Sequence, residues 1–204
     1  MMHELRRLPG KQILCKGRGM KIVGISGSLR EGSYNRLLLR AAQGMVEEDD
    51  SLKIFDLQQV PFYNADADTE IKPQPVQLLI DAVAGADGLL FATPEYNYSI
   101  PGVLKNAIDW ASRPAYKSVL ANKPTAILSA SVSPVGGARA QVHLRDIFSG
   151  TLTPVYPAPH YLLPSAPKAF DVDGQLVDKN VRDGLKRYLT GYLQWVSGLL
   201  ESDG

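Results

Sequence analysis

Residues 27–35, GSLREGSYN, carry the side-chain types that bind a phosphate group. They follow a short apolar run and precede an amphipathic one, so we expect them to join a strand to a helix N-terminus, where free N–H groups and the helix dipole favour an anion. Ser28 and Ser33 add hydroxyl donors there, while Arg30 adds a guanidinium group and Asn35 an amide. The spacing matches neither a dinucleotide fingerprint nor a nucleotide-hydrolysing P-loop. The alternative is an ordinary solvated turn in which Ser33 caps the helix.

Two further loops carry residues suited to a flat aromatic ligand. Residues 94–99, PEYNYS, combine two tyrosines and an asparagine that could stack on a ring and bond its edge. Residues 129–137, SASVSPVGG, end in a Gly136–Gly137 pair that permits close backbone approach or positive φ angles. Taken alone, each loop fits an ordinary surface turn equally well.

The elements around these loops alternate between apolar runs and amphipathic stretches. The expected strands are residues 21–26, 52–57, 87–93, 125–129 and 155–163. The expected helices are residues 34–47, 76–83, 101–111, 138–148 and 181–200, with Pro101 in the first turn of the third. This alternation predicts a doubly wound parallel sheet with helices on both faces. Since ligands bind at the carboxyl ends of such strands, the three loops should share one edge.

Composition limits the function classes. The chain has 204 residues, of which 45% are hydrophobic, and a net charge of +1, so one soluble domain is expected with neither nucleic acid nor membrane as a partner. His3, His143 and His160 all lie outside the three loops, and Cys15 is the only cysteine. A thiolate metal site or cysteine catalysis is therefore not expected, and we predict no metal and no catalytic side chain.

Charge separates the first 19 residues from the rest of the chain. They carry one acidic residue, Glu4, and five basic ones, which leaves −3 of the total charge for residues 20–204. We expect residues 1–19 to be a disordered extension, or the product of an upstream start codon, before one domain at residues 20–204. With no export signal in evidence, the expected compartment is the cytoplasm.

Three stretches together resemble the NADPH-dependent FMN reductase family of flavodoxin-like proteins. They are KIVGISGSLREGSYNR, TPEYNYSIPGVLKNAIDWASRP and GGARAQVHLRD. Within the family, the chain looks most like the bacterial soluble quinone reductases, also called chromate reductases. The resemblance implies a flavodoxin-like five-stranded parallel sheet in the order 2-1-3-4-5, and FMN as cofactor.

The resemblance also implies a role for residues in each loop. Ser28, Arg30, Ser33 and Asn35 would hold the FMN phosphate, with help from the backbone between Leu29 and Tyr34. Pro94, Glu95, Tyr96 and Asn97 would line the isoalloxazine ring, and Ser131, Gly136 and Gly137 would close its other side. Members are typically homodimers or homotetramers with the flavin near a subunit interface, which makes Tyr98 and residues 101–110 candidate interface elements. Trp110 fits the core equally well, and the proline-rich residues 156–163 leave the tetramer contacts open.

The implied activity is ping-pong hydride transfer from NADPH or NADH through bound FMN to quinones or similar acceptors. The flavin would carry this chemistry, which agrees with the absence of histidine from the three loops. A flavodoxin-type one-electron carrier and a non-catalytic flavin-binding protein are the alternatives. Flavodoxins are usually strongly acidic, whereas residues 20–204 carry only −3.

Overall fold

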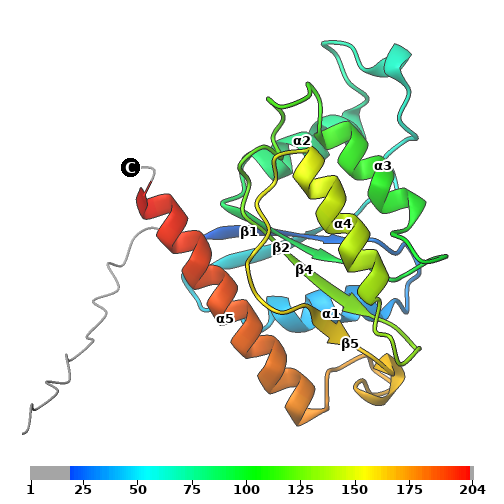
Figure 1. Ribbon diagram of the computed structural model, residues 1–204, viewed down its shortest axis with the longest axis vertical. Helices are drawn as coiled ribbons and strands as arrows, with labels where there is room; N and C mark the ends of the chain where they lie inside the picture. Colours follow the sequence, from blue (N-terminus) through cyan, green and yellow to red (C-terminus); the bar gives the residue numbers. More distant parts are fainter. Residues whose placement is uncertain (1–18, 203–204) are drawn as a thin grey trace, which may run out of the picture.

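The computed structural model describes residues 19–202, so most of the expected extension, including Cys15, lies outside the described residues. Five parallel strands form one sheet in the order β2-β1-β3-β4-β5, which confirms the predicted doubly wound topology (Figure 1). The strands are β1 (Lys21–Ser26), β2 (Ser51–Phe55), β3 (Gly88–Ala92), β4 (Thr125–Ala130) and β5 (Tyr161–Leu163).

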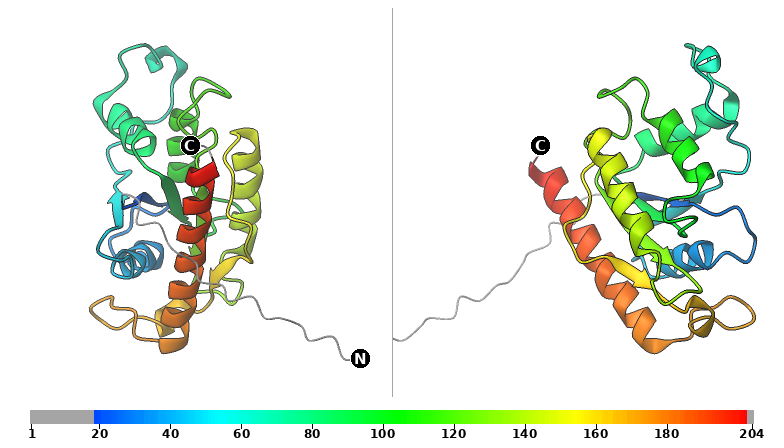
Figure 2. Two further views of the ribbon diagram at one scale, coloured as in Figure 1. Left: turned by 90° about the vertical axis from the view of Figure 1, so that its left-hand side faces the viewer. Right: turned by 45° about the vertical axis from the view of Figure 1, so that its right-hand side comes forward.

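Helices cover both faces of this sheet, as Figure 2 shows from two sides. One face packs against α1 (Tyr34–Gln43) and α5 (Lys179–Ser202), and the other against α2 (Gln74–Ala84), α3 (Gly102–Ala111) and α4 (Ala138–Gly150). Two short 3-10 helices, η1 (Ala65–Ala67) and η2 (Ala166–Lys168), lie in the connections. Because both faces are covered, every residue of β3 and β4 is buried.

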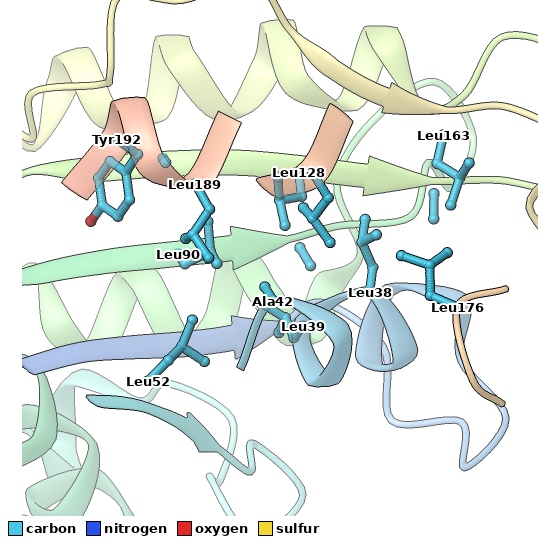
Figure 3. Close-up of a cluster of buried hydrophobic side chains, with 14 of the residues drawn as sticks. Leu38, Leu39, Ala42, Leu52, Leu90, Leu128, Leu163, Leu176, Leu189 and Tyr192 are labelled. Carbon is cyan, nitrogen blue, oxygen red and sulfur yellow. The ribbon is translucent and has the colours of Figure 1, made fainter. Parts of the chain in front are cut away.

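Figure 3 shows how one of the two cores forms from residues far apart in the chain. Leu38 and Leu39 of α1 meet Leu90 and Leu128 of the sheet, and Leu189 of α5 closes the cluster. The other core fills the space beneath α2, α3 and α4. The two cores hold β1, β3 and β4 rigidly, and with them the starting points of the three loops.

Two predicted elements are shorter in the structure than the sequence indicated. Helix α1 ends at Gln43 and not at residue 47, because Gly44 caps it, although Met45 still packs against the core. Of the predicted strand 155–163, Tyr161–Leu163 forms β5 beside β4, and Val155 makes one isolated bridge to Thr125. The pairing is interrupted between them, where Pro157 and Pro159 have no N–H to donate.

Two expectations about α3 are also decided by the structure. Pro101 stands at the N-cap of α3 and not in its first turn, so it precedes the helix. Trp110 is fully buried, donates its indole N–H to the Pro61 carbonyl over 2.9 Å, and packs edge-on against Tyr63 with ring centroids 4.8 Å apart. Of the two interpretations of Trp110, the structure supports the core.

Candidate functional site

The three loops predicted to hold a ligand leave β1, β3 and β4 at the same edge of the sheet (Figure 1). Gly27 donates its N–H to Ala92 at the end of β3, over 2.8 Å. Ser131 donates likewise to Leu163 at the end of β5, over 3.0 Å. The predicted meeting of the loops at one edge is therefore confirmed. We call residues 27–35 the phosphate loop, 94–99 the ring loop and 131–137 the glycine loop.

The phosphate loop presents hydroxyl groups at the N-terminus of α1. Ser33 is the N-cap of this helix, and its side chain accepts a hydrogen bond from the Arg36 N–H over 3.4 Å. Ser28 and Ser33 are both buried, while Arg30 is exposed and lies over the Tyr34 ring at 5.5 Å from its centroid. The first turn of α1 contains no acidic residue, so the helix dipole there is left for an external anion.

Asn35 joins the phosphate loop to the end of β4. Its side-chain amide donates to the Ala130 carbonyl and accepts from the Ala130 N–H, each over 2.9 Å, and the residue is buried. Both polar atoms of the side chain thus bond main chain of a neighbouring strand, a role that the sequence did not reveal. A contact between Asn35 and phosphate stays a prediction.

The ring loop makes a tight two-residue turn. Tyr96 and Ser99 exchange main-chain hydrogen bonds of 2.9 and 3.0 Å, and the residues between them, Asn97 and Tyr98, have φ angles of +49° and +68°. A left-handed conformation costs a residue such as tyrosine roughly 1–2 kcal/mol, so contacts elsewhere must hold it. Tyr96 and Tyr98 remain 52% and 65% exposed, which leaves their rings available to a ligand or a second subunit.

Glu95 connects the ring loop to α4. Its carboxylate accepts a hydrogen bond from the Arg139 main-chain N–H over 3.1 Å and forms an ion pair with the Arg139 guanidinium. That guanidinium lies 3.9 Å from the centroid of the Tyr98 ring. One turn further along α4, His143 Nδ1 lies 3.0 Å from Ser99 Oγ. Neither Arg139 nor His143 was predicted to contribute to the site. The available signal was their position in the first turns of the helix that follows the glycine loop.

The glycine loop requires its two glycines. Gly136 and Gly137 have φ angles of +66° and +85°, and a Cβ on Gly137 would lie 2.9 Å from Ser129 Cβ. The Ser129 hydroxyl donates to the Gly136 carbonyl over 2.6 Å, which fixes the loop to β4. The positive φ angles expected of the pair are confirmed, whereas close approach of this backbone to a flat ligand stays a prediction. Ser131 is half-buried, and its hydroxyl lies 3.3 Å from that of Ser133.

Other polar features lie away from this edge. Burial raises the pKa of Tyr161 and Tyr188 to about 12, and both tyrosine hydroxyl groups bond main-chain carbonyls in the layer between the sheet and α5. Hollows of about 620 and 430 Å³ lie at the opposite edge, beside the amino ends of the strands. Within residues 19–202, no cluster of three His, Cys, Asp or Glu could hold a metal ion. No helix in the same range is long and apolar enough to cross a membrane.

Comparison with known proteins gives a consistent result. The family model described as NADPH-dependent FMN reductase matches residues 20–168. The chain is 44% identical over 182 residues to an NAD(P)H-dependent FMN reductase of Pseudomonas aeruginosa, covering 88% of this chain and 97% of that protein. It is 38% identical to a 2-hydroxy-1,4-benzoquinone reductase of Burkholderia, covering 87% and 96%.

A solved structure shares the architecture as well as the sequence pattern. The flavoenzyme NAD(P)H:(acceptor) oxidoreductase of Paracoccus denitrificans superposes with a TM-score of 0.80 at 30% identity, covering 88% of this chain and 98% of that one. The residues matched by the family model, 20–168, include all five strands and all three loops.

Proposed function

The chain belongs to the NADPH-dependent FMN reductase family, and from that premise we propose that it is an FMN-dependent NAD(P)H oxidoreductase that reduces quinones or similar small acceptors. The observation that carries the proposal is the joining of three loops at one sheet edge, with anion donors at one end and a strained aromatic turn at the other. The names of its relatives, which include two quinone reductases of Pseudomonas putida, support the choice of acceptor.

The residues at this edge fit FMN. Hydroxyl groups of Ser28 and Ser33 and the uncompensated dipole of α1 suit a phosphate dianion. Gly136 and Gly137 carry no side chain that could keep a flat ring away from the main chain of this loop. The residues proposed to hold FMN are Ser28, Leu29, Arg30, Ser33, Tyr34, Asn35, Pro94, Glu95, Tyr96, Asn97, Ser131, Gly136 and Gly137.

The protein's own contribution is binding and orientation. FMN supplies the two-electron redox chemistry when it is bound, so the chain needs no acid–base side chain of its own. The α1 N-terminus would anchor the phosphate, while the ring loop and the glycine loop would hold the isoalloxazine ring. Main-chain N–H groups of these loops would stabilise negative charge that develops on the ring.

We further propose a homodimer or homotetramer in the cytoplasm. The exposed rings of Tyr96 and Tyr98 at the ligand edge suit burial by a second subunit. The cytoplasm is proposed because it supplies NAD(P)H. Sedimentation with and without FMN would measure the subunit number, and a monomer under both conditions would refute the oligomer.

The test of function uses the purified full chain. It should bind FMN stoichiometrically, appear yellow, and oxidise NADPH or NADH only when a quinone such as 1,4-benzoquinone is added. Parallel assays with both nicotinamides and a series of quinones would define the preferences. A protein that binds no FMN, or binds it and never oxidises either nicotinamide, would contradict the proposal.

A further inference from the structure

Helix α4 begins without a side-chain cap of its own. Its N-cap is Gly137 in the left-handed region, with φ +85° and ψ +22°, and no side chain there accepts a hydrogen bond. A serine, threonine or aspartate cannot replace this glycine, because a Cβ would approach Ser129 Cβ to 2.9 Å. The close packing of Gly137 against Ser129 thus removes the usual means of satisfying the first N–H groups of α4.

Glu95 supplies that missing cap from another loop. Its carboxylate accepts from the Arg139 N–H in the first turn of α4, where the helix dipole favours a negative charge. The Glu95 side chain is only 10% exposed, whereas that of Arg139 is 45% exposed, so the ion pair lies at the protein surface with its carboxylate side turned inward. The second carboxylate oxygen pairs with the guanidinium of the same residue, so both oxygens of Glu95 are engaged by α4.

Arg139 of α4 also contacts the ring loop through its guanidinium group. Its guanidinium lies over the ring of Tyr98, which is held at φ +68° in the two-residue turn. Ser99 closes a second link by its contact with His143 over 3.0 Å. The loop therefore touches α4 at Glu95, Tyr98 and Ser99, three of its six residues.

We propose that the Glu95 carboxylate is a positioning residue that locks the ring loop to the start of α4, so that both sides of the flavin ring site are preformed. This rests on the proposed function. Glu95 does not act by touching the ring through its carboxylate, which α4 already occupies. Removal of the Glu95 carboxylate leaves the strained turn of the ring loop and the first turn of α4 less ordered. Flavin binding must then order both segments, which lowers the affinity.

The test compares Glu95→Ala and Glu95→Gln with wild type and with Glu48→Gln, a surface control in the turn after α1. Quenching of flavin fluorescence measures Kd for FMN and for riboflavin, which lacks the phosphate. Loss of a charge-assisted contact pair should weaken binding of both flavins by about tenfold in Glu95→Ala, and by the same factor for each, because the phosphate loop is untouched. Glu95→Gln keeps an acceptor for the Arg139 N–H, so its loss should be smaller.

A second pair of variants makes the lock itself measurable. Arg139→Leu retains the main-chain N–H that Glu95 binds but removes the guanidinium over Tyr98. Its effect on riboflavin affinity should be smaller than that of Glu95→Ala. The double variant Arg139→Leu with Glu95→Gln should lose less affinity than the product of the two single losses, because the residues act through one contact.

Two results would overturn the inference. One is a lower melting temperature of the apoprotein in Glu95→Gln with unchanged Kd for both flavins, which would make Glu95 a helix cap alone. The other is weaker FMN binding with unchanged riboflavin binding, which would place the effect in the phosphate loop. Either result leaves the proposed function intact, whereas wild-type protein that binds neither flavin would refute that function instead.

Discussion

The phosphate loop is held mainly by neighbours along the chain, whereas the ring loop is held by residues 44 positions away. In the first, Ser33 caps the helix that it precedes and Arg30 lies over Tyr34 four residues later. In the second, a strained turn keeps its shape because Arg139 and His143 of α4 contact it. If the proposed site is correct, one strand–helix junction is enough to bind the charged group of the ligand, whereas its flat ring needs two loops that the fold brings together.

The largest effect on both stability and flavin binding is expected from Gly137→Ala in the glycine loop, which directly precedes the ring loop's partner helix α4. The new Cβ would contact Ser129 at a φ of +85°, so we expect a loss of roughly 2–4 kcal/mol in the free energy of unfolding and no detectable flavin binding. Urea denaturation and flavin titration measure the two effects. Gly198→Ala in α5, where a Cβ meets nothing within 4 Å, is the control and should stabilise by up to about 1 kcal/mol. Wild-type stability in Gly137→Ala would show that the close approach is relaxed in solution.

Asn35 is the residue of the phosphate loop whose side chain bonds a distant part of the chain, at Ala130. Asn35→Ala leaves the buried N–H and carbonyl of Ala130 without their partner, which should cost about 2–3 kcal/mol in the free energy of unfolding. Urea denaturation should show this loss, and Asn35→Asp should lose at least as much, because an ionised carboxylate cannot donate to the Ala130 carbonyl and is buried there. Gln77→Ala is the control, because the hydrogen bond that it removes lies at an exposed position of α2. Equal stability of Asn35→Ala and Gln77→Ala would exclude the joining role.

Ser33 tests whether the phosphate loop acts separately from the ring loop. Ser33→Ala removes the N-cap of α1, so the free energy of unfolding should fall by about 1 kcal/mol. FMN affinity should fall by about tenfold while riboflavin affinity is unchanged, because only the phosphate loses a partner. An equal loss for both flavins would mean that the two loops cannot be separated.

The smallest expected effect is that of Asn97→Gly in the ring loop. Glycine accepts a φ of +49° without strain, so stability should rise by at most about 0.5 kcal/mol, while FMN and riboflavin affinities should both fall about threefold as the side chain is lost. Asn122→Gly, at a φ of +60° by the opposite sheet edge, is matched in backbone conformation and should change stability alone. Identical flavin affinities in the two variants would remove Asn97 from the site.

Pattern alone predicted the parts of the fold that depend on local spacing. The bounds of strand β1 were predicted to the exact residue from its apolar pattern. The first residues of α1 and α4 were also predicted correctly, because Ser33 and Gly137 directly precede them. The end of α1 and the extent of β5 were predicted too long, since apolar residues outside a helix or strand can still pack against the core. Trp110 shows the same limit, because its core position depends on Pro61 and Tyr63 from another connection.

The parallel sheet, the edge at which the three loops meet and the position of the phosphate loop were predictable from the amino-acid sequence, because each follows from periodicity or from residues adjacent in the chain. The bond between Asn35 and Ala130 and the capping of α4 by Glu95 became evident from the three-dimensional arrangement. These contacts join segments 95 and 44 positions apart, and no local signal specifies the partner of a carboxylate or an amide at that separation. The packing of α4 and β4 against β3 brings those partners into reach.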